Sequence, residues 1–233
     1  MDGIIVVNKP SGITSYDVIR FLKRSCEVHD KIGHCGTLDP LAQGVLVVCI
    51  GKATKLSSMF MRLDKEYIAK MVLGQKTDTD DITGRIIKKE NAVYVNNAQV
   101  QEVITAFTGN IQQVPPSVSA IKHNGSPLYK LYRKGIVVIP EVRKVLIKEI
   151  EILCINIPYV EFRVVCSKGT YVRALCRDIG EKLGCGAVQT ELKRTRVGDL
   201  TLKDSFTLQE IKKLGIEKTL MNLSDINLSY KPV

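Results

Sequence analysis

The sequence contains no apolar run close to the ~20 residues that a membrane-spanning helix needs. Residues 1–7 carry neither a basic lead-in nor a small-residue cleavage site, so we expect no signal peptide. The seven cysteines are odd in number and include no C-x-x-C pair, which is typical of reduced thiols rather than of a disulfide framework. These absences favour a cytoplasmic protein that does not associate with a membrane.

Acidic residues are also few relative to basic ones. The chain has 24 Asp and Glu against 34 Lys and Arg, a formal net charge of +10. Such an excess indicates the kind of partner rather than the fold. Nucleic acid is the first candidate partner and an anionic membrane surface the second, but no basic amphipathic helix of the membrane-lying kind stands out. Nucleic acid is therefore the leading candidate partner.

Hydrophobic periodicity predicts strands and helices that alternate irregularly, with hairpins between them. Helices are predicted at 15–28, with Thr14 and Asp17 as a capping box, and after caps at Asn97, Thr170 and Thr207. The pattern is typical of the α+β class, with a mixed, largely antiparallel central sheet flanked by helices, in a single domain over residues 1–233. The predicted strands are 4–7, 45–50, 65–73, 85–88, 145–156, 159–166 and 187–197.

One loop, at residues 33–46, presents a lone carboxylate between glycines. Asp39 is followed by Pro40, which disfavours the α region for the residue before it. Gly44 then opens the apolar run 45–50. Loops held by a rigid scaffold often carry chemistry. The same residue types also make ordinary turns, so spacing alone leaves an active-site loop and a simple turn both open.

The stretch 115–148 differs in composition from the rest of the chain. From Lys122 to Lys148 it carries seven Lys or Arg against one acid, Glu141, with Tyr129 and Tyr132 among them. Basic residues neutralise phosphates and aromatic rings stack on bases, so this segment suits RNA. The alternative is a solvated surface excursion.

Arg173 lies in the first turn of its predicted helix, where a cation opposes the helix macrodipole at a cost of about 0.3–1 kcal/mol. This cost suggests a nearby anion, either a carboxylate or a phosphate. The alternative is an exposed arginine that bends into water.

Metal and nucleotide motifs are weak. Asp78, Asp80 and Asp81 fail as a calcium loop because the twelfth position is Lys89 rather than Glu, so carboxylates that support a turn are favoured. Residues 51–54 resemble a P-loop only loosely, with the glycine and threonine misplaced. Four side chains of the types that bind zinc have poor spacing for a structural site, so we predict no metal. These side chains are Cys26, His29, His34 and Cys35.

The segment 33–46, Gly-His-Cys-Gly-Thr-Leu-Asp-Pro-Leu-Ala-Gln-Gly-Val-Leu, resembles the signature of the TruB family of tRNA pseudouridine synthases. Five further blocks match that family in the same order, so the resemblance covers nearly the whole chain. It implies the pseudouridine synthase fold. The matching blocks are 7–12, 65–67, 74–84, 115–125 and 167–173.

The resemblance implies isomerisation of uridine to pseudouridine at position 55 in the T-loop of tRNA, by a monomer that binds the T-arm. Asp39 matches the catalytic nucleophile, and Tyr67 the tyrosine that stacks on the target base and assists proton removal at C5. Arg173 matches the arginine that pairs with the aspartate. The target base must be flipped out, at a cost of a few kcal/mol. Since the glycosidic bond is exchanged without redox or phosphate energy, we expect no cofactor.

The same resemblance assigns substrate-binding roles. Tyr171 and Leu192 match residues that line the pocket, and His34 matches a histidine that holds the displaced RNA loop. Lys9 matches a lysine that supports the active site. The segment 115–148 matches the insertion that clasps RNA. Many family members carry a C-terminal PUA domain, and we expect this chain to lack a complete one.

Two other functions remain open at this point. A non-catalytic tRNA-binding or tRNA-folding protein would have the same basic surface. A glycosidase acting on nucleic acid would need a second acid near Asp39, for which Glu66 is the obvious candidate.

Overall fold

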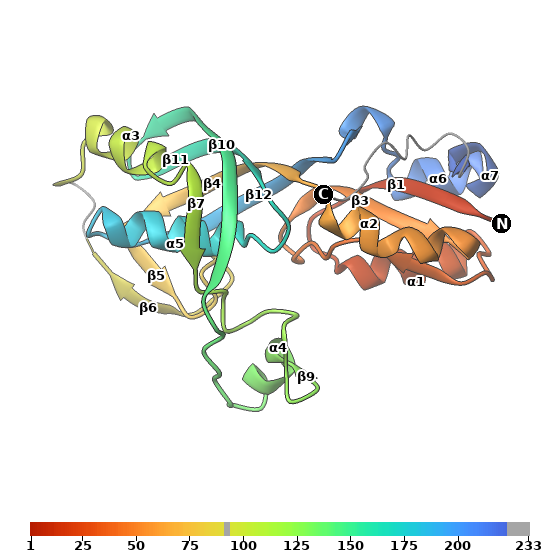
Figure 1. Cartoon of the computed structure of the whole chain (residues 1–233), viewed down its shortest axis with the longest axis horizontal. Coiled ribbons are helices and arrows are strands. Elements are labelled where there is room, and N and C mark those ends of the chain that lie inside the picture. Colours follow the sequence, from red (N-terminus) through yellow and green to blue (C-terminus); the bar gives the residue numbers. More distant parts are fainter. Residues whose placement is uncertain (91–93, 223–233) are drawn as a thin grey trace. The chain divides into compact units, whose positions relative to one another are not determined.

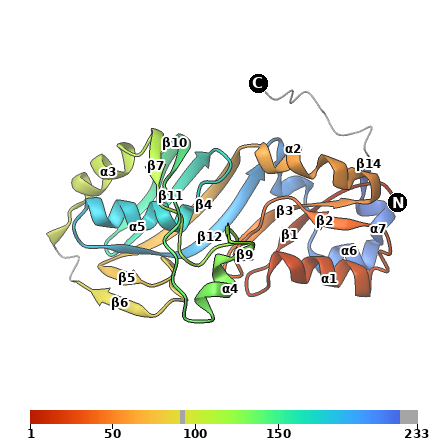
Figure 2. The ribbon, with the colours of Figure 1, turned by 60° about the horizontal axis from the view of Figure 1, so that its bottom comes forward.

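The predicted strands form the framework of the protein, whose structure is a computed structural model (Figures 1 and 2). The structure describes residues 1–90 and 94–222. Contacts within the chain divide it into two compact units. The terminal unit comprises Met1–Lys65 and Lys193–Val233, and the central unit comprises Glu66–Leu192. Both boundaries fall inside strands rather than in linkers, so the single domain predicted for residues 1–233 stays a prediction.

The terminal unit is built on two long antiparallel strands, β1 (Gly3–Lys9) and β3 (Gln43–Ile50), which pair over their whole length. Both are nearly continuous runs of buried apolar residues, as expected for strands covered on both faces. The end of β12 (Ala187–Val197) pairs in parallel with the start of β3. Short strands complete the unit: β2 (Ile32–His34) on β3, β13 (Leu200–Thr201) on β12, and β14 (Met221–Asn222) on β1.

The helices of the terminal unit are short, and two of them, α1 and α6, begin at capping boxes. Thr14 and Asp17 form the predicted capping box, and Thr207 forms a second one with Glu210. These caps satisfy amide groups that have no partner within the helix. The helices are α1 (Ser15–Ser25), α2 (Ser57–Arg62), α6 (Leu208–Leu214) and α7 (Ile216–Thr219), with 3₁₀ turns η1 (Gly51–Leu56) and η3 (Leu202–Asp204).

The central unit has its own, largely antiparallel sheet, in which the first part of β12 is followed by β4, β11, β10 and β7. The long β10–β11 hairpin turns between Asn156 and Tyr159. Helix α5 lies along this sheet with α3 beside it (Figures 1 and 2). The bounds are β4 (Lys65–Leu73), β7 (Gly109–Gln113), β10 (Arg143–Asn156), β11 (Tyr159–Cys166), α3 (Asn97–Thr105) and α5 (Val172–Lys182).

Two small hairpins lie outside the main sheet. β5 (Gln75–Thr77) pairs with β6 (Ile86–Lys89), and β8 (Lys122–His123) pairs with β9 (Ser126–Pro127) ahead of α4 (Leu128–Tyr132). In Figure 1, β9 and α4 stand away from the sheet of the central unit. The predicted insertion is therefore a distinct excursion of the chain, whereas its contact with RNA stays a prediction.

The α+β class and the mixed, largely antiparallel sheet are confirmed, and three local predictions are wrong. The first helix ends at Ser25, not at 28, because Glu27 adopts a left-handed φ of 53°. The cap of α3 is Asn96 rather than Asn97. Thr170 does not cap α5: its hydroxyl donates to the Ser167 carbonyl, and the N-cap position is one residue later. None of the described helices is long and apolar enough to cross a membrane.

Candidate active site

The predicted site residues fall in both units. Asp39, His34 and Lys9 belong to the terminal unit. The other four belong to the central unit: Tyr67, Tyr171, Arg173 and Leu192.

Asp39 lies on a partly exposed loop between β2 and β3. We call residues 35–44, which include this loop and the first two residues of β3, the Asp39 loop. Gly36 and Gly44 near its ends have φ of 97° and 106°, in the region that favours glycine. At Gly44 a Cβ would lie 2.2 Å from the Arg194 carbonyl oxygen, so this position also requires close backbone approach. These constraints fix the ends of the loop.

Hydrogen bonds from neighbouring segments hold the middle of the Asp39 loop. The Ser15 hydroxyl accepts from the Leu38 N–H at 2.9 Å and donates to its carbonyl at 3.1 Å. The Ser11 hydroxyl donates to the Leu41 carbonyl at 2.7 Å. Gly12 N–H donates to the Pro40 carbonyl at 2.8 Å. These bonds fix the backbone on both sides of Asp39, which is the kind of preorganisation that a catalytic side chain requires.

Lys9 is fully buried beside this loop. Its ammonium donates to three carbonyl oxygens, those of Pro10 at 2.9 Å, Ile13 at 2.7 Å and Pro40 at 3.4 Å. Burial lowers the pKa of Lys9 to about 8; the Asp39 carboxylate raises this pKa, and Arg194 lowers it further. The carboxylate of Asp39 therefore lies within electrostatic reach of the buried ammonium.

Arg194 is the second buried cation at the loop, and sequence reasoning missed it. Its side chain is only 1% exposed, and Nε donates to the Val45 carbonyl at 2.7 Å while Nη2 donates to the Gly36 carbonyl at 3.0 Å. A run of basic residues in β12 was visible in the sequence. Nothing local distinguished the buried arginine from its partly exposed basic neighbours, Lys193 and Arg196.

His34 lies on β2, directly before the loop. Its pKa is lowered chiefly by burial and then by the charge of Arg194, so the imidazole is neutral at pH 7. Cys35 is fully buried with its sulfur 3.2 Å from that of Cys49, as expected of a small packing residue. Within residues 1–90 and 94–222, no cluster of His, Cys, Asp or Glu could hold a metal ion.

Arg173 is not exposed to water: its side chain is 5% exposed. Nη1 donates to the Thr79 carbonyl at 3.1 Å, and Nη2 to the Val118 carbonyl at 2.7 Å. The carboxylate of Asp81 lies 3.7 Å from Nη1, so a carboxylate does stand beside this cation in the first turn of α5. The pairing of Arg173 with Asp39 stays a prediction.

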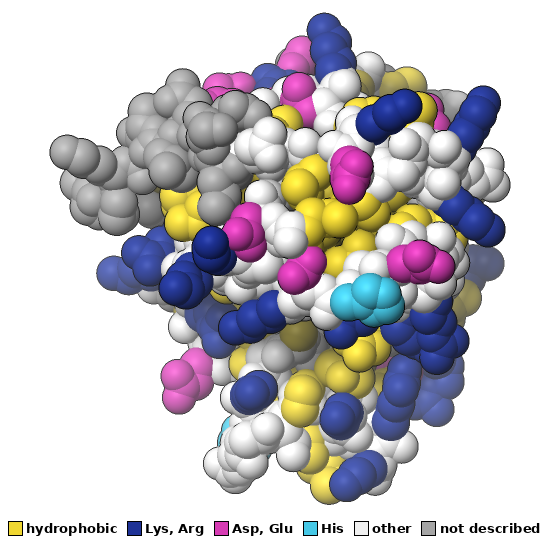
Figure 3. All heavy atoms as spheres, turned by 90° about the vertical axis from the view of Figure 1, so that its right-hand side faces the viewer, with side chains coloured by type: hydrophobic (Ala, Val, Ile, Leu, Met, Phe, Trp, Pro, Cys, Tyr) yellow, Lys and Arg dark blue, Asp and Glu magenta, His cyan; other side chains and the backbone are white. Residues whose placement is uncertain are grey.

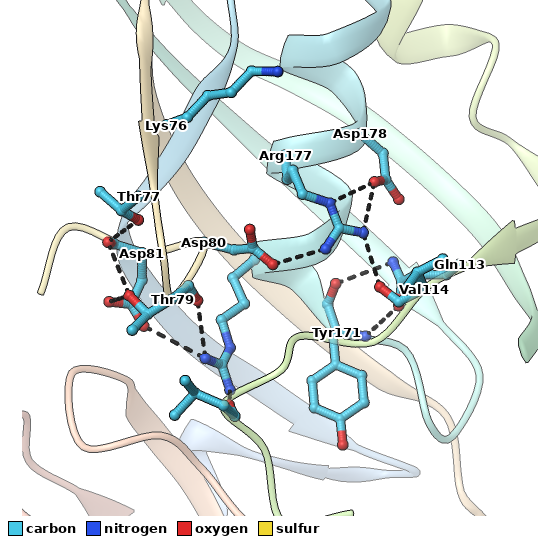
Figure 4. Close-up of polar contacts among 12 residues, drawn as sticks. Lys76, Thr77, Thr79, Asp80, Asp81, Gln113, Val114, Tyr171, Arg177 and Asp178 are labelled. Carbon is cyan, nitrogen blue, oxygen red and sulfur yellow. Dashed lines mark hydrogen bonds and ion pairs between the residues drawn. The ribbon is translucent and has the colours of Figure 1, made fainter. Parts of the chain in front are cut away.

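The three aspartates near residue 80 do more than support a turn, and Figure 4 shows two of them, Asp80 and Asp81. Asp78 and Asp81 do accept backbone N–H groups, from Arg85 and Thr83 respectively. Asp80 instead pairs with Arg177 at 2.8 Å. Burial raises the pKa of Asp80, and the charge of Arg177 opposes that rise.

Arg177 and Gln113 complete a polar network around α5 that the sequence did not reveal (Figure 4). Arg177 Nη2 donates to the Val114 carbonyl at 2.8 Å. Gln113 bonds both backbone groups of Tyr171 at the N-cap of α5. The only usable signal was the spacing of Arg173 and Arg177, four residues apart on one helix face. Tyr67 and Leu192 are both nearly buried, at 9% and 8% exposure.

The predicted RNA-clasping segment is largely exposed and basic. Tyr129 lies under the Arg133 guanidinium, 5.7 Å from the ring centroid, while the Tyr132 hydroxyl donates to Asp78 at 2.6 Å. Elsewhere, Lys and Arg side chains are spread widely over the face seen in Figure 3. Both observations agree with an anionic partner.

Two family models together match most of the chain. The model of the TruB family pseudouridylate synthase N-terminal domain matches residues 23–172, and that of the tRNA pseudouridylate synthase B C-terminal domain matches 173–225. The chain is 48% identical to tRNA pseudouridine synthase B of Clostridium tetani, over 95% of this chain and 76% of the relative. It is 42% identical to the protein of that name from Francisella tularensis, over 100% of this chain and 78% of the relative.

Solved structures are also similar to this chain. The chain is 32% identical to a chain of "Crystal Structure of a Cbf5-Nop10-Gar1 Complex", with a TM-score of 0.70 over 91% of this chain and 54% of that one. It is 30% identical to a chain of "Structure of H/ACA RNP bound to a substrate RNA containing 2'-deoxyuridine", with a TM-score of 0.68 over 91% of this chain and 52% of that one. The chain thus spans about half the length of those two. From the family match and these relatives, the chain belongs to the TruB family of pseudouridylate synthases.

Proposed function

We propose that the protein converts uridine to pseudouridine at position 55 in the T-loop of tRNA, with Asp39 as the nucleophile. The observation that carries this proposal is the Asp39 loop, a partly exposed carboxylate on a backbone that Lys9, Arg194 and two serines hold through its carbonyl groups. The substrate class follows from the relatives, which are named tRNA pseudouridine synthase B.

The reaction exchanges one glycosidic bond for another. The N1–C1′ bond of the uridine breaks, the uracil turns, and a C5–C1′ bond forms, while the C5 proton is lost and N1 gains one. The Asp39 carboxylate forms a transient bond, either to the sugar or to the base. Because the atoms and electrons balance within the nucleotide, a positioned carboxylate suffices as covalent catalyst and no cofactor is required.

The other predicted site residues bind and orient the flipped base. Tyr67 stacks on the uracil, which returns about 1–3 kcal/mol of the cost of unstacking. Tyr171 and Leu192 line the pocket, and Arg173 pairs with the catalytic carboxylate. His34, neutral at pH 7 because burial lowers its pKa, holds the displaced RNA loop without a charge of its own. The basic segment 115–148 clasps the T-arm.

Incubation with a T-arm RNA, followed by nucleoside analysis, tests the proposal. We expect pseudouridine from the wild type and none from Asp39→Asn, with RNA binding retained by the variant. Asp30→Asn is the matched control, since Asp30 is an exposed aspartate that pairs with the N-terminal amine, and it should keep full activity.

Each alternative has its own product. Unchanged uridine with tight binding would identify a tRNA-binding or tRNA-folding protein, which the net charge of +10 also favours. Free uracil would identify a glycosidase. Turnover retained by Asp39→Asn would contradict the nucleophile assignment.

A further inference from the structure

Arg194 holds both ends of the Asp39 loop with one guanidinium. Nη2 donates to the carbonyl of Gly36, near the start of the loop, at 3.0 Å, and Nε donates to the carbonyl of Val45, directly after its end, at 2.7 Å. The guanidinium is planar and its donors are fixed in a fork, so two carbonyls bound at once are set relative to each other. A lysine ammonium has no such fixed spacing.

The backbone of Arg194 constrains the same loop. Arg194 pairs with Gly44 where β12 runs parallel to β3. A Cβ on Gly44 would lie 2.2 Å from the Arg194 carbonyl oxygen and 3.0 Å from its nitrogen. The end of the loop is thus packed directly against the residue whose side chain reaches across to the start of the loop.

The burial of Arg194 is hard to explain by stability alone. The residue is 1% exposed, and its Nε and Nη2 donate to neutral carbonyl groups. A buried charge is costly unless it is compensated, and apolar residues of similar volume often serve stability as well or better. An arginine at this position therefore points to a requirement for loop geometry.

We propose that Arg194 is a positioning residue for the reaction: its guanidinium ties Gly36 to Val45 and so sets the position of the Asp39 carboxylate. This inference rests on the proposed role of Asp39 as nucleophile. Arg194 acts through the loop backbone, to which its Nε and Nη2 donate.

Three variants separate positioning from general stability. Arg194→Ala removes both donors, Arg194→Lys keeps the charge without the fork, and Arg196→Ala is the matched control. Arg196 lies on the same strand, and its Nη1 donates to the Gly198 carbonyl. For each folded variant, the single-turnover rate at saturating T-arm RNA, the Kd for that RNA, and amide hydrogen exchange of residues 36–44 are measured.

For Arg194→Ala we expect a loss in rate of ~100-fold, the scale on which a misplaced catalytic group acts. The Kd stays close to that of the wild type, because the lost interaction serves the transition state. Hydrogen exchange of residues 36–44 becomes faster, and guanidinium ion at non-denaturing concentration restores part of the rate. Arg194→Lys has a rate and an exchange behaviour between those of Arg194→Ala and the wild type, and Arg196→Ala matches the wild type in both.

Two results overturn the inference: a folded Arg194→Ala with the wild-type rate, or a slow variant whose 36–44 amides exchange as in the wild type. If Arg194→Ala does not fold, Arg194→Lys decides by the same two measurements. If Asp39→Asn retains turnover, the proposed function fails at the nucleophile. The exchange data still show whether Arg194 fixes the loop.

Discussion

Gln113 and Tyr171 form a two-point clamp between the end of β7 and the N-cap of α5. The Tyr171 N–H donates to Gln113 Oε1 at 2.8 Å, and Gln113 Nε2 donates to the Tyr171 carbonyl at 3.2 Å. The side-chain amide thus pairs with both backbone groups of one residue, as a neighbouring strand would (Figure 4). Gln113 is 1% exposed, so the pair is protected from water.

Gln113→Leu should destabilise the protein by about 1–3 kcal/mol, because it leaves two backbone groups of Tyr171 without these partners. Urea unfolding measures this cost. Gln112→Leu is the control, since Gln112 is the exposed neighbour on the same strand and should change stability by less than about 0.5 kcal/mol. Equal effects of the two substitutions would show that the clamp contributes nothing.

The Arg177–Asp80 pair should couple α5 to the turn that carries Asp81. A double-mutant cycle with Arg177→Met and Asp80→Asn is expected to give a coupling energy of about 1–2 kcal/mol, because the pair is mostly buried and 2.8 Å apart. The exposed pair Arg20–Asp17 is the reference and should give about 0.5 kcal/mol or less. A coupling no larger than that reference would mean that the buried pair does not hold the turn.

Gly44→Ala should be more damaging than a comparable substitution in open space. Gly44 and Gly109 have similar φ, 106° and 100°, but a Cβ on Gly109 meets nothing within 4 Å. Gly109→Ala introduces the backbone strain alone, about 1–2 kcal/mol. Gly44→Ala adds overpacking against the Arg194 backbone, ~1–3 kcal/mol more. Thermal or urea unfolding measures the loss of stability in each variant. Equal losses would contradict the close approach of the Arg194 backbone to Gly44.

Lys9 should make stability depend on pH above neutrality. Its pKa is about 8 in the folded protein and near 10.5 when unfolded, so between these values the unfolded chain binds more protons and stability rises with pH. The cost of burying the ammonium is fully present below pH 8 and disappears toward pH 10.5. It amounts to at most about 3.5 kcal/mol, at roughly 1.4 kcal/mol for each unit of pKa.

The measurement for Lys9 is the difference in unfolding free energy between the wild type and Lys9→Met at pH 7 and pH 10. We expect the unfolding free energy of the wild type to increase relative to that of Lys9→Met as pH rises. Lys213→Met, at an exposed site on α6, should show no such trend. A difference that is flat or that falls with pH would refute the burial argument.

Salt should weaken binding of the T-arm RNA, since each neutralised phosphate releases counterions. Replacement of Lys130, Arg133 or Lys134 by Ala should reduce the slope of log Kd against log salt by about one for each phosphate that is no longer neutralised. Lys213→Ala serves as the control. If the slope were unchanged in all three variants, the segment 115–148 would not be the surface that binds RNA.

Local sequence determined the bounds of several strands and the capping of two helices. The predicted bounds of β4, β11 and β12 agree with the structure, because each strand is specified by its own pattern of apolar residues. Thr14 and Thr207 were predicted as caps because both halves of a capping box lie within four residues. Thr170 was wrongly predicted because the chain turns into α5 one residue later, held by the distant Gln113.

The sequence by itself also identified the family, because the Asp39 block is a contiguous motif. Only the tertiary structure decided which charges are buried and what they hold. Two carbonyl partners of Arg173 lie 94 and 55 residues away in the chain, and two of Arg194 lie 149 and 158 residues away. An arginine looks the same in sequence whether it points into water or ties two carbonyls together, and packing of distant strands makes that difference.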